Sequence, residues 1–579
     1  MKYLLATILL FTLGACGLHQ PVENTATAPA AKTTTEQHPP TQTDLSGMQP
    51  DFLYLAAQKA AREGNRELAL QLLTALIAKQ PNAITPHMQL IDLLMESGRI
   101  DEAEQHIARM LSNKALPAEQ REQLQLAQYR IYIAHDQPQL ALEKLNTFLQ
   151  KHPAHDTART MQASILAGLG RMDEALASIK LGIKQHESAG LRMLQARLLI
   201  KRGDLKRAKA SLLRVQHLMP DNDAAVLMLS ALAAQMKDHE QAEKLLRDFL
   251  ANHPQDIRVS HALAKLLVAQ ARLPEAIIVY RNAAKHAGDS PVVLRPLGML
   301  YFQDKDYEQA VQTFRTLVKL QPDDSNRFYL AASLEAMDKL DEAKSIYTKI
   351  THASKMYTQA QIRLAAMDLQ ENKLSKAKAR MLAILHEKPQ QLDAHLLLST
   401  IRLNSKEYKQ VLDETEPLLR LKKLPPQLLF NRAVAFEHFK NYDQVETTLN
   451  RVLEHSPNYT EALNFLGYTY ADQGIKLDRA KVLILRALHL KPNDGYYLDS
   501  LAWVYYKTGD YKQAAETQAK AIKLIADDSV MHEHYGDILW RSGNTQAAQQ
   551  AWRKALELKS DHPRLIEKKI SKGLPPVDR

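Results

Sequence analysis

The sequence contains a single cysteine, Cys16, among its 579 residues. One thiol cannot form an intramolecular disulfide, and it cannot supply the several thiolates of a structural zinc or iron–sulfur site. Aromatic residues make up only 6% of the chain, and no Gly-rich phosphate-binding pattern occurs. These absences exclude a disulfide scaffold and a thiolate metal cluster, and they argue against nucleotide-dependent catalysis.

Segments that alternate Val, Ile and Thr are almost absent, whereas Ala, Leu, Gln and Lys are abundant. Because these are strong helix formers, the composition predicts an all-α protein. Lys and Arg outnumber Asp and Glu by 75 to 65, which gives a net charge of +10. Such a charge would suit acidic partners or anionic lipid headgroups. However, the basic residues are scattered, which favours a solvated helical surface and predicts no nucleic-acid-binding arm.

The N-terminus has the pattern of an export signal, with Lys2, an apolar stretch over residues 3–13, and the small residues Gly14 and Ala15. The apolar stretch is too short to span a bilayer, which takes about 20 residues. Residues 13–16, Leu-Gly-Ala-Cys, resemble the bacterial lipobox. This resemblance implies cleavage before Cys16 and lipidation of its thiol. The alternative is an ordinary signal peptide in which the cysteine is incidental.

The residue after the cysteine is Gly17, where inner-membrane lipoproteins of enteric-type sorting carry Asp. The resemblance therefore implies anchoring in the outer membrane, with the body of the protein facing the periplasm. Residues 16–49 are rich in Thr, Pro and Ala and contain almost nothing apolar. Such a segment cannot bury enough surface to offset its ordering entropy. We therefore predict a signal peptide over residues 1–15 and a lipidated, disordered tether over residues 16–49.

The remaining sequence repeats with a period near 34 residues. A small residue, usually Ala, recurs five positions after a polar or Gly turn, at intervals of 33 to 35 residues with one interval of 38. We refer to these positions as the marker residues. They are Ala69, Ala103, Ala141, Ala175, Ala208, Ala242, Ala276, Ala310, Ala343, Ala377, Val411, Val445, Ala480, Ala514 and Ala548.

Other positions keep the same period. A Pro stands twelve residues after many marker residues, a small residue twelve before, and Gly often occupies the turn between. Small residues let two helices approach closely, and Pro punctuates a helix exit. With the segments Asn464–Tyr468 and Leu501–Tyr506, this pattern resembles the tetratricopeptide repeat. The resemblance implies a right-handed α-solenoid of about fifteen helix–turn–helix repeats over residues 50–562, followed by a cap and tail over residues 563–579.

Two short patterns superficially suggest catalysis. His532-Glu533-His534 lacks the spacing that places two imidazoles on one helical face, and Gly288-Asp289-Ser290 precedes a Pro at an inter-repeat turn. The first is more simply a polar stretch of helix, and the second a helix cap. We therefore expect no enzyme active site, no metal ion and no cofactor.

In tetratricopeptide arrays the first helix of each pair lines the inner groove. Projecting the repeat onto this face predicts a groove that is basic in the middle and aromatic with carboxylates toward the C-terminus. The candidate protein-binding residues are Arg258, His261, Lys265, Arg295, Asn464, Tyr468, Tyr496, Asp499, Trp503, Tyr506 and Trp540. For Trp503 and Trp552 the alternative, a place in the core between repeats, is favoured.

The segments Ala462–Tyr468 and Asp499–Trp503 resemble the repeats of lipoprotein adaptors that deliver substrates to carboxyl-terminal processing proteases. The resemblance implies a membrane-anchored scaffold for periplasmic or envelope proteins. A scaffold for exopolysaccharide export or for cell-wall synthases is the alternative. Binding of single-stranded RNA is disfavoured, because the groove positions show no recurring polar code and the export signal separates the protein from RNA.

The lipobox generates the first prediction. Replacement of Cys16 by Ser removes the thiol that would carry the lipid, so the protein should leave the membrane fraction or accumulate with its signal uncleaved. Membrane fractionation and metabolic labelling with palmitate test this. Continued recovery of the Ser variant with the outer membrane would contradict lipid anchoring at Cys16.

Overall fold

The computed structural model describes residues 47–421 and 423–575. The predicted signal peptide, Cys16, the predicted tether up to residue 46 and the predicted tail from residue 576 lie outside this range. The described residues form 31 α-helices and one short 3-10 helix, and they contain no strand. Among them, no helix is both long and apolar enough to cross a membrane. The all-α prediction is therefore confirmed.

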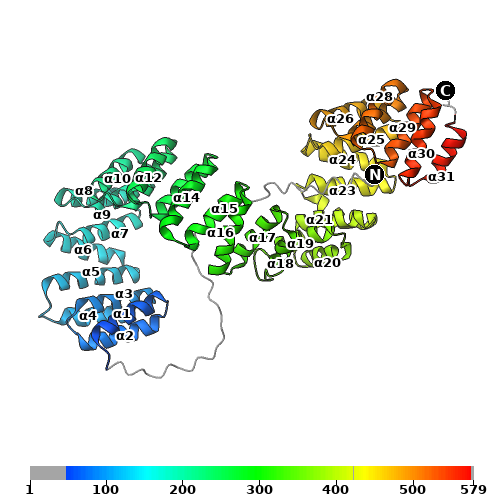
Figure 1. Ribbon diagram of the computed structural model, residues 1–579. Coiled ribbons are helices and arrows are strands. Elements are labelled where there is room, and N and C mark those ends of the chain that lie inside the picture. Colours follow the sequence, from blue (N-terminus) through cyan, green and yellow to red (C-terminus); the bar gives the residue numbers. More distant parts are fainter. Residues whose placement is uncertain (1–46, 422, 576–579) are drawn as a thin grey trace. The chain divides into compact units, whose positions relative to one another are not determined.

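The helices form fifteen pairs and one additional C-terminal helix (Figure 1). The first helices of the pairs are α1 (Pro50–Arg62), α3 (Ile84–Glu96), α5 (Ala118–Ala134), α7 (Asp156–Gly168), α9 (Ala189–Arg202), α11 (Asp223–Gln235), α13 (Ile257–Ala269), α15 (Pro291–Gln303), α17 (Asp324–Ala336), α19 (Tyr357–Gln370), α21 (Leu392–Asn404), α23 (Pro426–His438), α25 (Thr460–Gln473), α27 (Gly495–Lys507) and α29 (Ser529–Arg541). The second helices are α2 (Arg66–Lys79), α4 (Ile100–Ser112), α6 (Pro138–Lys151), α8 (Met172–Gln185), α10 (Leu205–Leu218), α12 (His239–Asn252), α14 (Leu273–Ala287), α16 (Tyr307–Leu320), α18 (Leu340–Tyr347), α20 (Leu374–Glu387), α22 (Tyr408–Thr415), α24 (Tyr442–His455), α26 (Leu477–Leu490), α28 (Tyr511–Leu524) and α30 (Thr545–Glu557). The additional helix is α31 (Pro563–Lys572), and the 3-10 helix η2 (Glu416–Arg420) continues α22.

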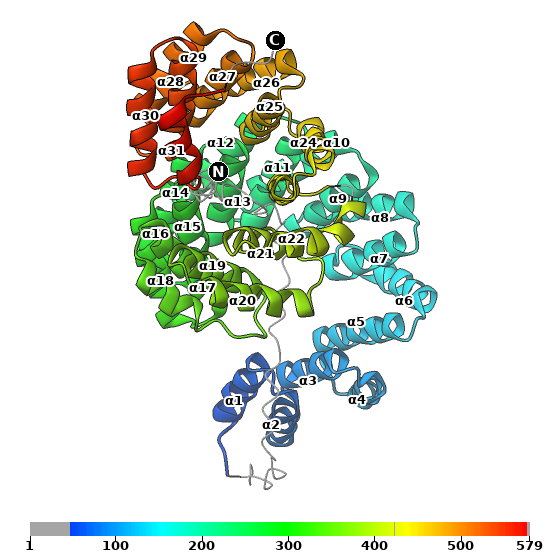
Figure 2. The ribbon, with the colours of Figure 1, turned by 90° about the vertical axis from the view of Figure 1, so that its right-hand side faces the viewer.

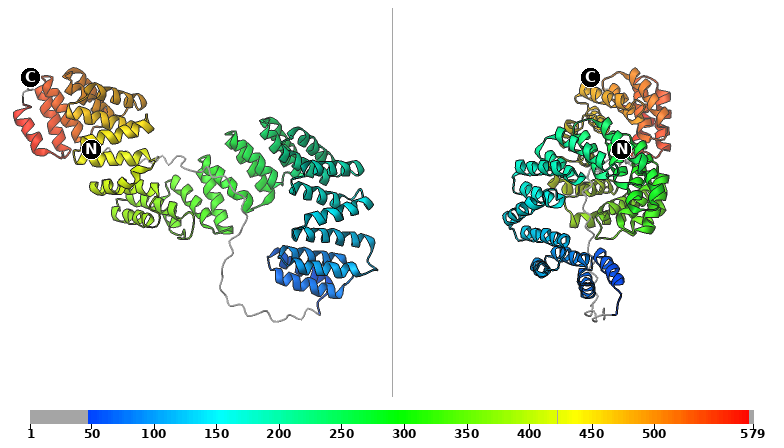
Figure 3. Two further views of the ribbon diagram at one scale, coloured as in Figure 1. Left: turned by 180° about the vertical axis from the view of Figure 1, so that it is seen from behind. Right: turned by 90° about the vertical axis from the view of Figure 1, so that its left-hand side faces the viewer.

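The chain divides into two compact units, one ending at Leu300 and the other beginning at Tyr301. Within each unit the helices stack in chain order, and each pair packs on the next (Figures 1 and 3). Their cores consist mainly of Ala, Leu, Ile and Val side chains shared between neighbouring pairs. This continuous stacking is the arrangement expected of a solenoid, in which no repeat buries its apolar face alone.

The marker residues explain how the two helices of a pair fit together. Each is the fourth residue of its second helix, and every one of the fifteen has a relative exposure of 0%. A small residue on the facing helix completes the contact. A Cβ atom added at Gly536 would lie 2.3 Å from the Trp552 ring, and one added at Gly467 would lie 2.6 Å from Ile484. The helices therefore approach too closely for larger side chains at these positions.

The turns and exits follow the predicted period as well. The residue five positions before the marker adopts a positive φ, as at Gly98 (73°) and Gly203 (84°). Where this residue is not Gly the conformation is kept, as at Ala271 (59°). The predicted Pro residues lie two positions beyond the ends of second helices, as Pro81 does after α2.

Two departures from the period have identifiable structural causes. The interval of 38 residues is accommodated by α5, which has 17 residues where α3 and α7 have 13. The extra residue in the thirteenth turn produces two left-handed residues, Gly474 (φ 71°) and Lys476 (φ 46°), instead of one. Both insertions are thus absorbed without loss of the pairing between helices.

The zero exposure of Ala514 generates the second prediction. Replacement of Ala514 by Leu should overpack the contact between α27 and α28 and lower the free energy of unfolding by about 1–3 kcal/mol. Urea unfolding followed by tryptophan fluorescence suits this test, because all three tryptophans lie in the last two repeats. Replacement of the neighbouring exposed Gln513 by Leu is the control and should have little effect. An unchanged urea midpoint for the Ala514 variant would contradict the assigned contact.

Candidate protein-binding site

The basic candidates lie in the first unit, three on α13 and one on α15: Arg258, His261, Lys265 and Arg295. The three on α13 are exposed and share one helical face, while Arg295 is half-buried. Arg258 pairs with Asp223 of α11, and the ring of His261 bonds to the hydroxyl of Tyr280 on α14. Burial and the charge of Lys265 lower the pKa of His261. Arg258, His261 and Arg295 therefore all have interactions within the chain.

The aromatic candidates in the second unit form a stack across consecutive first helices. The Trp503 ring on α27 lies between Tyr506, with a centroid separation of 4.6 Å, and His534 of α29, at 4.1 Å. Tyr468 of α25 lies 6.3 Å from the His534 ring. Trp503 is only 8% exposed, as the core alternative requires, whereas Tyr468 and Tyr506 are half-buried and reach the surface.

His534 stands at the centre of this stack, and our sequence reasoning missed it. Its Nδ1 lies 3.0 Å from the Asp499 carboxylate, which also accepts a 2.6 Å hydrogen bond from Gln518 Nε2 of α28. Burial alone would lower the pKa of His534, but the carboxylates of Asp499, Asp537 and Glu533 outweigh it and raise the pKa. The sequence did contain one indication of this contact: His534 follows Asp499 by 35 residues, which is one repeat period.

Carboxylates from four consecutive first helices surround Tyr468. Burial raises the pKa of the Tyr468 hydroxyl well above its usual value, and nearby carboxylates raise it further: Asp472, Asp499, Glu437 and Glu533. Burial also raises the pKa of Glu437. The C-terminal end of the predicted groove is therefore acidic as well as aromatic. We call Tyr468, Trp503, Tyr506, His534 and these four carboxylates the aromatic–acidic cluster.

Three buried polar atoms at this cluster have no hydrogen-bond partner among the described residues. They are Glu437 Oε2 on α23, Asn464 Oδ1 on α25 and Trp503 Nε1 on α27. Asn464 shares a face of α25 with Tyr468, four residues along. Buried polar groups in folded proteins almost always have partners, so three such atoms on the first helices of three consecutive pairs are unusual. Together they provide one hydrogen-bond donor and two acceptors.

The far end of the cluster is covered by α31, which packs on α30 (Figure 2). The ammonium group of Lys569 lies 2.7 Å from Glu533 Oε1 and 2.7 Å from Asp537 Oδ2. Trp552 Nε1 donates a 2.8 Å hydrogen bond to Asp537. Trp540 is half-buried against Trp552, with a centroid separation of 5.5 Å. Lys569 therefore joins α31 to the last repeat, within which Asp537, Trp540 and Trp552 contact one another.

The last aromatic candidate, Tyr496, is half-buried and packs against the core of the second unit. The basic residues predicted for the middle of the groove belong to the other unit. The structure thus brings together five of the candidates: Asn464, Tyr468, Asp499, Trp503 and Tyr506.

One group of side chains among the described residues could hold a metal ion. It consists of Asp101, Glu104 and His135, in the first unit. The sequence analysis did not identify it, because two of these residues lie near the start of α4 and the third follows α5.

The raised pKa of His534 generates the third prediction. A histidine that binds its proton more tightly when folded stabilises the fold fully below its unfolded pKa, about 6.5, and loses this contribution as the pH rises through the folded pKa. The raised pKa of Asp537 acts in the same direction but at lower pH, from the unfolded pKa of an aspartate, about 3.9, upward. The urea midpoint of the tryptophan signal should therefore fall as the pH rises above about 6.5. Replacement of His534 by Gln should flatten this dependence, and replacement of His532, on the same helix, should not. Equal pH profiles for the three proteins would contradict the assignment.

Comparison with known proteins agrees with the repeat register. Three family models described as tetratricopeptide repeat match this chain, one at residues 60–123, 199–266 and 267–334, another at 126–189, and the third at 496–528 and 531–562. Together they cover more than half of the chain.

Individual relatives are more distant. A TPR repeat-containing protein of Pseudomonas aeruginosa is 34% identical over 119 residues, which is 20% of each chain. Anaphase-promoting complex subunit 3 of Schizosaccharomyces pombe is 23% identical over 267 residues, 46% of this chain and 35% of that protein. This chain thus spans only a fifth to about a third of the length of these two relatives. A crystal structure of an APC/C hetero-tetramer aligns over 92% of this chain and 97% of the matched chain, at 14% identity and a TM-score of 0.43. The matched repeats and the fifteen helix pairs identify the chain as an all-α solenoid of the tetratricopeptide-repeat family.

Proposed function

We propose that this protein is a membrane-anchored scaffold that binds other proteins in the bacterial envelope. The observation that carries the proposal is the aromatic–acidic cluster, where half-buried Tyr468 and Tyr506 adjoin three buried polar atoms without partners. Aromatic anchors ringed by polar groups are typical of interface hot spots. An unpaired buried polar group costs about 1–3 kcal/mol, and a bound partner that supplied the missing hydrogen bonds would recover this free energy.

The compartment follows from the N-terminal sequence. The lipobox-like residues 13–16 and Gly17 favour an outer-membrane lipoprotein whose solenoid faces the periplasm. More than one acyl chain is needed for stable anchoring, which a lipidated Cys16 would provide. In this arrangement the tether of residues 16–49 links the lipid to the helices. A scaffold held in this way meets its clients near the membrane surface.

The finer proposal is delivery of substrates to a carboxyl-terminal processing protease. The segments Ala462–Tyr468 and Asp499–Trp503, which resemble adaptor repeats, contain several residues of the aromatic–acidic cluster. The relative from S. pombe is named as a subunit of a larger complex, which is compatible with a role in assembly. A scaffold for exopolysaccharide export or for cell-wall synthases is the alternative, and the identity of the captured partner separates the two.

The fourth prediction tests the cluster with two neighbouring tyrosines. Tyr506 stacks on Trp503, whereas Tyr505 is also half-buried but lies under Lys481 of α26. Replacement of Tyr506 by Ala should weaken client capture at least about tenfold, as expected for a hot-spot anchor. Replacement of Tyr505 by Ala should leave client capture intact.

The measurement is a pull-down from envelope extract with the full mature chain, with circular dichroism showing that each variant folds. Recovery of a carboxyl-terminal processing protease that depends on Tyr506 would support the finer proposal. Recovery of a synthase or an export protein would favour the alternative. Equal capture by both variants would exclude the cluster as the client site.

A further inference from the structure

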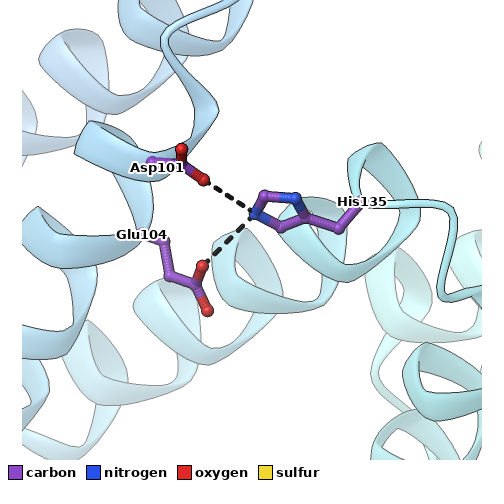
Figure 4. A group of neighbouring side chains, drawn as sticks. All are labelled: Asp101, Glu104 and His135. Atoms are coloured by element: carbon purple, nitrogen blue, oxygen red, sulfur yellow. Dashed lines mark ion pairs between the residues drawn. The ribbon is translucent and has the colours of Figure 1, made fainter.

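Asp101, Glu104 and His135 converge where the second and third repeats meet (Figure 4). Both carboxylates lie near the start of α4, three residues apart on one helical face. His135 is the residue directly after α5 and points its ring between them. The three side chains thus come from two helices that belong to different repeats.

The contacts between these groups do not form ordinary hydrogen bonds. His135 Nε2 lies 3.3 Å from Glu104 Oε2 and 3.6 Å from Asp101 Oδ1. Both separations exceed the usual range of about 2.7–3.2 Å for a nitrogen–oxygen hydrogen bond. Accordingly, His135 Nε2 is buried and has no hydrogen-bond partner among the described residues. A single imidazole nitrogen thus lies within ion-pair distance of two carboxylates without an ordinary hydrogen bond to either.

The separations do fit the ligands of a shared metal ion. With metal–ligand bonds of about 2.1 Å, neighbouring vertices of a tetrahedron lie about 3.4 Å apart. The two measured separations lie on either side of that value, and all three ligand atoms are within 4.8 Å of one another. Asp101 is 85% exposed, so an ion can enter directly from solvent.

We propose that Asp101, Glu104 and His135 bind a zinc ion that joins the second repeat to the third. Imidazole and carboxylate together suit Zn²⁺, which accepts three protein ligands and a water molecule in tetrahedral geometry. Ca²⁺ and Mg²⁺ prefer oxygen ligands only, so the imidazole disfavours them. This site is independent of client binding at the aromatic–acidic cluster, which belongs to the other unit.

Two other histidines of the first unit each pair with one carboxylate. His152 lies 3.5 Å from Glu122, and His186 lies 3.2 Å from Asp156. Only the group at His135 brings three potential ligands together within the described residues. A single carboxylate and an imidazole leave too few ligands for a stable zinc site, so these pairs serve as internal controls.

The position of the site suggests what the ion would do. The interval between the second and third marker residues is the one of 38 residues, and its extra length forms the longer helix α5. A metal ion bonded to both α4 and the end of α5 would cross-link the two repeats where the regular period is interrupted. Because binding occurs only in the folded state, the ion would stabilise this junction.

The experiment uses the full mature chain without a histidine tag, treated with a chelator and then titrated with Zn²⁺ by calorimetry. The wild-type chain should bind one more Zn²⁺ than the His135→Ala variant. Glu104→Gln keeps the shape of the side chain but removes its charge. It should lower the affinity of that site for Zn²⁺ at least about 10- to 100-fold, since loss of a group that only hydrogen-bonds to a metal ligand already has an effect of this size. His152→Ala should bind like the wild type. Subtracting the titration of the His135→Ala variant from that of the wild type removes the heat of Zn²⁺ binding to the other histidines.

A second readout locates the ion. Zn²⁺ should slow amide hydrogen exchange over residues 100–135 in the wild type and in His152→Ala, and leave it unchanged in His135→Ala. Melting curves recorded in chelator establish whether each variant folds without metal. If the His135→Ala variant does not fold, the Glu104→Gln variant decides the test. Superimposable titrations of wild type and Glu104→Gln would overturn the proposal. Equally tight binding of Mg²⁺ or Ca²⁺ would overturn the assignment to zinc.

Discussion

The close approach of two helices at the marker residue is the contact on which the rest of the structure depends. At all fifteen copies this residue is completely buried, and it stands at the same place in the second helix. A small side chain there sets the distance between the helices of a pair, because a larger one would force the backbones apart. That distance in turn determines how each pair presents its apolar face to the next. The solenoid is the repetition of this one contact.

Because the fold requires so few positions in each repeat, the face of each first helix that is predicted to line the groove is free to vary. In the first unit this face carries basic residues such as Arg258, which pairs with the carboxylate of Asp223. The second unit uses it for an aromatic stack surrounded by acidic groups. Three of the buried polar atoms that lack hydrogen-bond partners among the described residues lie beside this stack, at Glu437, Asn464 and Trp503. Fold and recognition thus depend on different residues of the same helices.

The C-terminal end shows how a solenoid can end without exposing its last apolar face. Helix α31 takes the place where a further first helix would pack, and Ile566 is fully buried against the last pair. Lys569 of α31 forms ion pairs with Glu533 and Asp537 of α29. A lysine from the chain itself therefore neutralises carboxylates at the end of the aromatic–acidic cluster. The carboxylates near Tyr468 that remain are those of the preceding helices.

The sequence alone determined the helix pairs, the turns and the buried small residues, because these recur at a fixed spacing and depend on contacts within one repeat or with its neighbour. It also predicted that Trp503 and Tyr506 share one face of their helix, since residues three apart lie together, and the repeat period assigned Tyr468 to the corresponding face of another helix. Tertiary structure alone decided that His534 stands at the centre of the stack and that Lys569 of α31 pairs with Asp537. It also brought His135 to Asp101 and Glu104. Each of these features joins side chains from different repeats or from a helix outside the period. The distances between such side chains depend on how the repeats pack on one another. The spacing of residues along the sequence does not determine that packing.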